Sequence, residues 1–198
     1  MKKINIAVLV SGGGTNLQAL IDAGNSGIIN SGEIKLVISN NPDAYALQRA
    51  ENANISTIVC NKKELGADFE DTLINILDDN NIDIIVLAGF MCILSEKFTT
   101  YFANRIINVH PSLIPSFCGK GFYGLHVHEA ALEYGVKVTG ATVHFVNEIP
   151  DGGKIIMQKA VEINDDDTPE TLQKRVMQEA EWKILPLALE KVCKEFIE

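Results

Sequence analysis

The regular alternation of short apolar runs with longer amphipathic segments constrains the fold of this chain more than any other feature. Five runs rich in β-branched residues are typical of strands, at residues 4–10, 33–39, 56–60, 82–88 and 106–110. Four amphipathic segments separate them, at residues 16–23, 43–52, 66–80 and 95–103. The strand runs are almost continuously apolar, as a sheet covered on both faces requires. This order predicts an α/β, Rossmann-like fold with a mostly parallel central sheet and helices on both faces.

The pattern changes in the last third of the chain. Two strand-like runs, at residues 138–146 and 154–161, lie only about seven residues apart. That gap is too short for a crossover helix, so we expect an antiparallel C-terminal strand pair at one edge of the sheet. Thr168-Pro169-Glu170 is typical of a helix start, and the last helix is expected to reach about Phe196. Because neither a repeat nor a linker interrupts the chain, residues 1–198 are expected to form one domain.

Composition excludes several classes of function. The 198 residues carry a net charge of −9, which argues against nucleic acid or an anionic membrane as the main partner, because both are bound through excess Lys and Arg. The apolar N-terminal run is too short to span a membrane and ends in a glycine turn rather than a cleavage site. The four cysteines are too widely spaced for zinc-ribbon or thioredoxin motifs: Cys60, Cys92, Cys118 and Cys193. We therefore expect a reduced, cytoplasmic protein whose partners are small molecules.

A glycine-rich turn follows the first predicted strand, where the ligands of parallel sheets bind. Its sequence is Ser11-Gly12-Gly13-Gly14-Thr15-Asn16. The glycines let a ligand approach the backbone, and the start of the next helix offers free N–H groups to a phosphate. The turn lacks the lysine of a Walker A loop and the spacing of a dinucleotide fingerprint, so neither nicotinamide nor flavin is expected. The alternative is a tight turn that binds nothing.

Three polar residues are candidates for catalysis. Asn108 and His110 are two residues apart at the end of the fifth predicted strand, so their side chains point to the same face. Together they can donate two hydrogen bonds to an oxygen that gains negative charge. Asp151 lies in the turn between the last two strands, where it is either an ordinary turn aspartate or a third member that accepts a proton.

The four histidines raise the question of a metal site, because all of them fall within 35 residues. The spacing of His110, His126, His128 and His144 does not match a zinc motif, and we expect no metal. His126 and His128 are assigned to a loop and helix start. His144 shares a strand face with Thr142 and is expected to line a pocket.

Four segments of the chain resemble the phosphoribosylglycinamide formyltransferases, a folate-dependent family of purine synthesis. They are the SGGGTN turn, AGFMCIL at 88–94, INVHPSLIP at 107–115 and GATVHFV…DGG at 140–153. The resemblance extends from the first strand to the final helix. It implies transfer of the formyl group of 10-formyltetrahydrofolate to the glycyl amine of glycinamide ribonucleotide. It also implies direct transfer through a tetrahedral intermediate, with the folate as co-substrate and without a metal.

The resemblance also assigns roles to residues. It makes Asn108, His110 and Asp151 the catalytic triad. Residues 1–105 become the half that binds the phosphate and the ribonucleotide, and residues 106–198 the half that carries catalysis and the folate. The residues implied for the ribonucleotide are Gly12, Gly13, Gly14, Thr15, Asn16 and, for the sugar, Glu181. Those implied for the folate are Met91, Cys92, Ile93, Leu94, Asn108, Thr142 and His144. Because both substrates are anionic and the chain is acidic, attraction must be local, from the turn itself and from Arg105 or Lys120.

The chain departs from the family pattern at a few positions. Cys92 stands where an arginine is common, Gly66 aligns with a basic folate-contacting residue, and the loop 117–124 is longer than in some members. Glu181 is followed by Trp182, where a histidine is common. Binding of the folate glutamate is therefore expected to differ.

Three rival functions remain at this point, and so does the choice between monomer and homodimer. The first is a hydrolase that uses the same triad to release formate. The second is a formyltransferase acting on charged tRNA, which needs an added RNA-binding domain and positive charge. The third is a binding module without catalysis, which would explain the glycine turn but not the triad.

Overall fold

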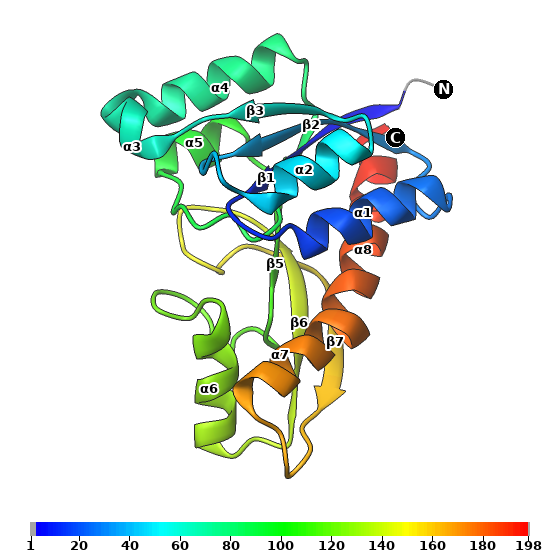
Figure 1. Cartoon of the computed structure of the whole chain (residues 1–198), viewed down its shortest axis with the longest axis vertical. Coiled ribbons are helices and arrows are strands. Elements are labelled where there is room, and N and C mark those ends of the chain that lie inside the picture. Colours follow the sequence, from blue (N-terminus) through cyan, green and yellow to red (C-terminus); the bar gives the residue numbers. More distant parts are fainter. Residues whose placement is uncertain (1–2, 198) are drawn as a thin grey trace.

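The computed structural model describes residues 3–197, in which seven strands form one sheet of order β3-β2-β1-β4-β5-β6-β7 (Figure 1). The strands are β1 (Ile4–Val10), β2 (Gly32–Ser39), β3 (Ser56–Val59), β4 (Ile84–Leu87), β5 (Ile106–His110), β6 (Val138–Phe145) and β7 (Ile155–Glu162). The first five strands pair in parallel, β6 is antiparallel to β5, and β7 is antiparallel to β6. The predicted α/β, Rossmann-like sheet with an antiparallel C-terminal pair is confirmed.

The helices connect the strands and follow them. They are α1 (Thr15–Asn25), α2 (Tyr45–Asn52), α3 (Lys62–Leu65), α4 (Phe69–Asp79), α5 (Glu96–Tyr101), α6 (Leu125–Tyr134), α7 (Pro169–Val176) and α8 (Trp182–Ile197). A wider π-helical turn, Met177–Glu181, joins α7 to α8. Thr168 caps α7 as expected, because its hydroxyl accepts a hydrogen bond from the Thr171 N–H, with Pro169 in the first turn.

Two sequence expectations about the helices need correction. The segment 66–80 was expected to be one helix, but Gly66 has a φ of +55°, which an α-helix does not allow. The chain therefore makes a short 3₁₀ turn at Gly66–Asp68 before α4 begins at Phe69. Helix α6 was foreseen only as a helix start, although it runs for ten residues to Tyr134.

The core lies on both faces of the sheet, as the apolar strand runs predicted. In β1, Ile6 and Val8 pack on one face with side chains from α1, α2 and α8. Ala7 and Leu9 pack on the other face with side chains from α4 and α5. Figure 1 shows these two layers of helices on either side of the upper sheet. Because each fully buried Leu, Ile or Val contributes roughly 1.5–3 kcal/mol, this double coverage holds the parallel strands in place.

The loops after the parallel strands β1, β4 and β5 lie at one edge of the sheet. Strand β6 is antiparallel, so it ends beside Ile107, near the start of β5. One link between these loops is a hydrogen bond from the Met91 N–H to the Ser11 hydroxyl oxygen, 2.8 Å long. The opposite edge holds Arg105, which precedes β5 and donates hydrogen bonds to the carbonyls of Ile82 and Asp83. The expectation that Arg105 attracts the substrates is therefore wrong, because its guanidinium ties loops together at the amino ends of the strands.

The structure also bears on membrane association. None of the helices within residues 3–197 is long and apolar enough to cross a membrane.

Candidate active site

A cavity of about 800 Å³ opens at the carboxyl ends of the strands. One end is lined by Asn16, Met177 and Glu181, from the start of α1 and the π-helical turn. Asn108, His110 and His144 form its wall at the junction of β5 and β6. The other end is lined by loop residues 89–94, 119–124 and 146–151. The cavity therefore spans from the glycine turn to the loops that follow the antiparallel strands.

The turn between β6 and β7 places Asp151 over the cavity wall. Asp151 has a φ of +57°, in the left-handed region that aspartate tolerates better than most residues. The next two residues must be glycine, because a Cβ at Gly152 would lie 2.7 Å from Ile149 and one at Gly153 would lie 1.7 Å from the Phe145 carbonyl oxygen. This close approach folds the turn back onto the end of β6. The carboxylate of Asp151 is thereby directed at the histidines of the sheet.

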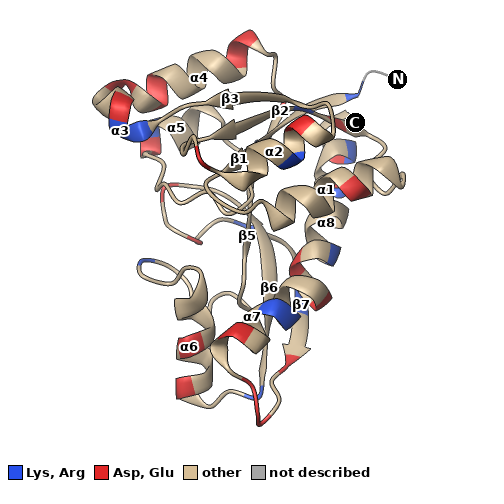
Figure 2. Cartoon of the chain, viewed as in Figure 1, with Lys and Arg blue, Asp and Glu red and all other residues tan. Residues whose placement is uncertain are grey.

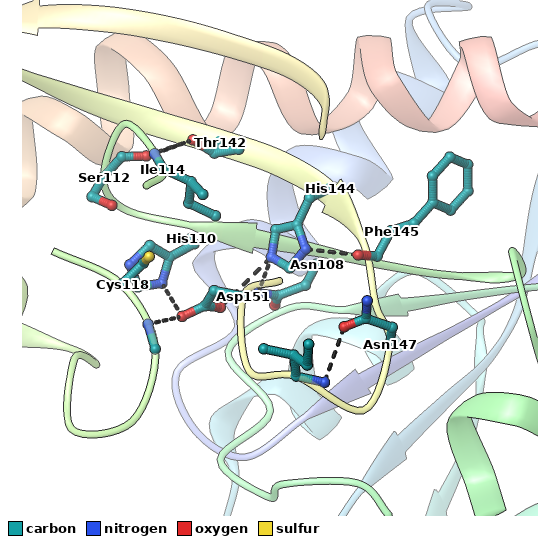
Figure 3. A network of polar contacts seen from close by, with 12 residues as sticks. Asn108, His110, Ser112, Ile114, Cys118, Thr142, His144, Phe145, Asn147 and Asp151 are labelled. Carbon is teal, nitrogen blue, oxygen red and sulfur yellow. Dashed lines mark hydrogen bonds and ion pairs between the residues drawn. The ribbon is translucent and has the colours of Figure 1, made fainter. Parts of the chain in front are cut away.

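The Asp151 carboxylate lies between two imidazole rings (Figure 3). Its Oδ2 atom is 3.5 Å from His110 Nδ1 and accepts a 2.8 Å hydrogen bond from the Gly119 N–H. Its Oδ1 atom is 3.6 Å from His144 Nε2. Burial acts to raise the pKa of Asp151, but His144, His110 and the Gly119 N–H outweigh it and hold that pKa below its usual value. Asp151 is therefore an ionised carboxylate at neutral pH.

His110 ends β5 and is only 5% exposed. Its Nδ1 atom faces Asp151, and its Nε2 atom is 2.8 Å from the Phe117 carbonyl oxygen. Burial lowers the pKa of His110 below its usual value, although Asp151 and the Phe117 carbonyl act in the opposite direction. Both ring nitrogens face oxygen acceptors, so the contacts of the ring match the charged form, in which both nitrogens donate.

Asn108 is oriented by His144, its partner across the antiparallel strands β5 and β6. The His144 Nδ1–H group donates a 2.8 Å hydrogen bond to the Phe145 carbonyl oxygen. The His144 Nε2 atom lies 3.2 Å from the Asn108 amide nitrogen, so this contact orients the Asn108 side chain at the cavity wall.

Thr142 was assigned to the folate together with His144, but the two residues are placed differently. His144 lines the cavity. Thr142 is fully buried, donates its hydroxyl to the Ser112 carbonyl and accepts a hydrogen bond from the Ile114 N–H. It braces the segment after His110 and is not among the residues that line the cavity.

The glycine turn lies beside the other end of the cavity. Gly14 has a φ of +71°, and a Cβ there would lie 2.6 Å from that of Ala46. Gly12 and Gly13 are different, because a Cβ at either would meet nothing within 4 Å. The space over these two glycines is open to a ligand. Thr15 begins α1 and lines a neighbouring groove rather than the cavity.

Asn16 and Glu181 meet at this end of the cavity. The Asn16 amide nitrogen donates a 2.8 Å hydrogen bond to Glu181 Oε2, and the Asn16 Oδ1 atom is buried without a partner among the described residues. Burial raises the pKa of Glu181 to about 7, although the hydrogen bond from Asn16 acts in the opposite direction. The pair can offer acceptors to hydroxyl groups of a ligand.

Arg49 was missed by the sequence analysis. Its Nε–H donates a 2.8 Å hydrogen bond to the Gly13 carbonyl oxygen, and its guanidinium lies over the Tyr45 ring, 5.0 Å from the centroid. This places a fixed positive charge beside the glycine turn. A single arginine on an amphipathic helix carries no signal that distinguishes it from an ordinary surface residue.

The stretch assigned to the folate, residues 91–94, lines the mouth of the cavity. Met91 is 58% exposed and Ile93 is 69% exposed, and Ile149 and Tyr123 are exposed on other parts of the lining. The Cys92 sulfur accepts a 2.9 Å hydrogen bond from the Asn40 amide, and Leu94 is buried. The mouth therefore offers apolar side chains to a flat aromatic ligand.

His128 is a second residue whose importance the sequence did not signal. It lies in α6, is fully buried and lines the cavity, and neither ring nitrogen has a partner among the described residues. Burial lowers the pKa of His128 to about 4, and the nearby His110 acts in the same direction. Within residues 3–197, no group of three or more His, Cys, Asp and Glu residues is arranged to hold a metal ion.

Comparison with known proteins places these observations in a family. The formyl transferase family model matches residues 4–189. A phosphoribosylglycinamide formyltransferase of Haemophilus influenzae is 46% identical over 191 residues, covering 96% of this chain and 86% of the relative. The human trifunctional purine biosynthetic protein adenosine-3 is also 46% identical over 97% of this chain, which spans only 18% of that protein's length.

Solved structures agree with the sequence comparison. The crystal structure of glycinamide ribonucleotide transformylase 1 from Symbiobacterium toebii aligns with a TM-score of 0.90 at 40% identity, over 98% of this chain and 89% of the other. That structure therefore shares both the fold and a large part of the sequence.

Proposed function

The chain belongs to the phosphoribosylglycinamide formyltransferases of the formyl transferase family, and we propose that it performs their reaction by direct transfer in the cavity described above. The reaction moves the formyl group of 10-formyltetrahydrofolate to the glycyl amine of glycinamide ribonucleotide, a step of purine biosynthesis. The products are the N-formyl ribonucleotide and tetrahydrofolate. Residues 1–105 hold the phosphate end, and residues 106–198 carry the catalytic and folate residues, with Glu181 reaching back to the ribonucleotide.

The ribonucleotide binds at the end of the cavity beside the glycine turn. Helix α1 has no side-chain cap, so the first N–H groups of this 11-residue helix are free for the phosphate. The open space over Gly12 and Gly13 admits the phosphate, and Arg49 adds a cation beside it. Asn16 and Glu181 then accept hydrogen bonds from the sugar. This arrangement directs the glycyl amine towards the wall formed by Asn108 and His110.

The formyl donor enters from the other end. Its pteridine and benzoyl rings pack against Met91, Ile93 and the turn that carries Asp151, and its formyl group lies at Asn108 and His110. The amine attacks the formyl carbon, so a C–N bond forms and the carbonyl electron pair moves to the oxygen. A tetrahedral intermediate results, with an oxyanion and a positively charged nitrogen.

The three polar side chains act on this intermediate. Asn108 and His110 donate hydrogen bonds to the oxyanion, and one preorganised donor of this kind contributes about 10²–10³ in rate. Asp151 stabilises the charged His110 and takes the proton of the attacking amine through a water molecule. Breaking of the bond between the formyl carbon and N10 completes the transfer, and the folate nitrogen receives the proton.

The contact between His110 and Phe117 imposes a condition on this mechanism. The Phe117 carbonyl lies 2.8 Å from Nε2, the atom that has to donate to the formyl oxygen. The formyl oxygen must therefore replace that carbonyl, and the start of the loop 117–124 must move when the donor binds. Because a charged histidine exchanges one oxygen acceptor for another, the number of hydrogen bonds is conserved.

One observation carries the proposal: an ionised Asp151, His110 and Asn108 meet on the wall of a cavity that extends from Asn16 and Glu181 to the loops at 89–94 and 119–124. The test is an absorbance assay of the purified protein with 10-formyltetrahydrofolate, with and without glycinamide ribonucleotide. We expect tetrahydrofolate to form only when the ribonucleotide is present, with one formylated product for each folate consumed. Formate release at the same rate without ribonucleotide would identify a hydrolase instead.

A further inference from the structure

The charges around the cavity are uneven. Among the described residues that line it, the carboxylates are Glu148, Asp151 and Glu181, and Lys120 is the only lysine or arginine. Both proposed substrates are anionic. An acidic cavity that receives anions needs a cation where the anionic group lies, because like charges would otherwise oppose binding.

The backbone presents Lys120 at the tip of a loop. Gly119 has a φ of +85° and Gly121 a φ of +96°, so the chain is left-handed on both sides of the lysine. A Cβ at either glycine would meet nothing within 4 Å, so glycine is needed there for backbone conformation and not for space. The side chain of Lys120 is exposed and forms no ion pair with the residues that the structure describes.

The same loop holds both ionisable members of the catalytic triad. The Phe117 carbonyl contacts His110, and the Gly119 N–H donates to Asp151. Phe117 also packs edge-on against Phe122 and Tyr134, which anchors the loop to α6. Lys120 directly follows Gly119, which contacts Asp151, and it lies three residues after Phe117, which contacts His110. An anion bound at Lys120 is therefore close along the chain to both contacts.

The position of the loop indicates which anion Lys120 meets. In Figures 1 and 2 the loop before α6 projects on the opposite side of β5 from α1, and Lys120 lines the cavity from this loop. The phosphate end has its own cation in Arg49 and the free N–H groups of α1. The anion near Lys120 therefore belongs to the other substrate, whose carboxylates are those of the glutamate attached to its benzoyl ring.

We propose that Lys120 is a specificity-determining residue that pairs with a glutamate carboxylate of the formyl donor. This inference rests on the proposed function. Binding of that carboxylate favours the loop position in which the Gly119 N–H holds Asp151, so recognition of the glutamate is coupled to the catalytic triad. A donor without glutamate loses this interaction.

The test compares Lys120→Ala and Lys120→Arg with the wild-type protein, and Lys159→Ala serves as the control because Lys159 is exposed on β7 and does not line the cavity. Dissociation constants of tetrahydrofolate and of tetrahydropteroate, which lacks the glutamate, are measured by calorimetry. KM values of both formylated donors and of the ribonucleotide are measured by absorbance. The thermal midpoint of each variant checks that it is folded.

Lys120→Ala is expected to raise the dissociation constant of tetrahydrofolate and the KM of its formyl derivative about two- to fivefold, the range of an exposed ion pair. Lys120→Arg is expected to bind tetrahydrofolate almost as tightly as the wild-type protein, and Lys159→Ala should change neither the dissociation constant nor the KM. Added salt should reduce the difference in affinity between Lys120→Ala and the wild-type protein. With the pteroate compounds, Lys120→Ala and the wild-type protein behave alike.

Three results would overturn the proposal. The first is that Lys120→Ala and the wild-type protein bind tetrahydrofolate equally well, and the second is that Lys120→Ala weakens binding of the pteroate compounds as much as binding of the folate compounds. The third is that Lys120→Ala raises only the KM of the ribonucleotide. The last would assign Lys120 to the phosphate. Binding is measured without turnover, so an inactive wild-type protein refutes the proposed function, whereas unchanged folate binding refutes only the role of Lys120.

Discussion

The two ends of the cavity are built from different kinds of structure. At the glycine-turn end, Asn16 in the first turn of α1 meets Glu181 in the π-helical turn, and both residues belong to helices that are packed on the sheet. At the other end, Asp151 belongs to a tight turn and its partner Gly119 belongs to a loop. The first end is fixed by the core of the fold, whereas the second is held by hydrogen bonds to loop backbone.

This difference matches the tasks that we propose for the two ends. A phosphate and a sugar need a fixed site, and helix starts provide one without rearrangement. The chemical step needs His110 to exchange the Phe117 carbonyl for the formyl oxygen. A carbonyl group on a loop can move away from His110, whereas one in a packed helix or strand cannot. Loss of a group that acts on the reacting atoms should therefore affect turnover, and changes at the glycine-turn end should affect ribonucleotide binding and stability.

The largest effect is expected at the three residues of the catalytic triad. Asn108→Ala, His110→Ala and Asp151→Asn should each lower kcat by about 10²–10³, because each removes a group that acts on the charges of the tetrahedral intermediate. The dissociation constant of the ribonucleotide should stay within about twofold. Both are measured with purified variants, kcat by absorbance and binding by calorimetry. Asp165→Asn is the control, because Asp165 is exposed and pairs with Lys137. A kcat near the wild-type value for any of the three would remove that residue from the mechanism.

The sequence predicted the regular parts of the molecule better than the contacts between them. The continuous apolar run of β1 predicted a sheet covered on both faces, because successive side chains point to opposite faces and all of them are buried. The bond between Asn16 and Glu181 joins residues 165 positions apart, and no local pattern encodes such a contact. Arg105 was misassigned although parallel pairing alone puts the start of β5 at the edge away from the ligands.

The loop contacts were out of reach for a different reason. The hydrogen bonds of Phe117 and Gly119 depend on left-handed backbone at both residues, with φ values of +48° and +85°. Glycine permits such a conformation without requiring it, and phenylalanine disfavours it. The sequence could therefore indicate that the loop 117–124 is unusual in length, but it could not indicate which backbone groups meet His110 and Asp151.

The next effect in size concerns the buried carboxyl at the glycine-turn end. Burial raises the pKa of Glu181 to about 7 from its ordinary value of 4.5. The wild-type protein should therefore lose stability as the pH rises from about 4.5 to about 7, because the folded state resists ionisation, by at most about 3 kcal/mol. Glu181→Gln should remove this loss. Urea unfolding at pH 5 and pH 8 measures it, with the exposed Glu179→Gln as the control. Equal pH dependence in wild type and Glu181→Gln would show that Glu181 is ionised without cost.

His128 provides the opposite pH dependence at the loop end. Burial lowers its pKa to about 4 from 6.5, so stability should be lost as the pH falls from about 6.5 through about 4, again by at most about 3 kcal/mol. His128→Leu should reduce this loss of stability at acid pH, as measured by the free energy of urea unfolding at pH 7 and pH 4. His126→Leu is the control, because His126 is exposed and pairs with Glu129. If His128→Leu loses as much stability at acid pH as the wild-type protein, other groups cause that loss of stability.

The smallest effect is expected within the glycine turn, where two adjacent glycines separate stability from binding. Gly14→Ala combines a φ of +71° with a Cβ 2.6 Å from that of Ala46, so it should lower the free energy of unfolding by about 1–3 kcal/mol. Gly13→Ala meets neither obstacle and should leave the free energy of unfolding within about 0.5 kcal/mol of the wild-type value. Its methyl group occupies the open space over the turn, so the ribonucleotide should nevertheless bind more weakly. Urea unfolding and ribonucleotide calorimetry on both variants separate the two effects, and unchanged ribonucleotide binding by Gly13→Ala would place the phosphate elsewhere.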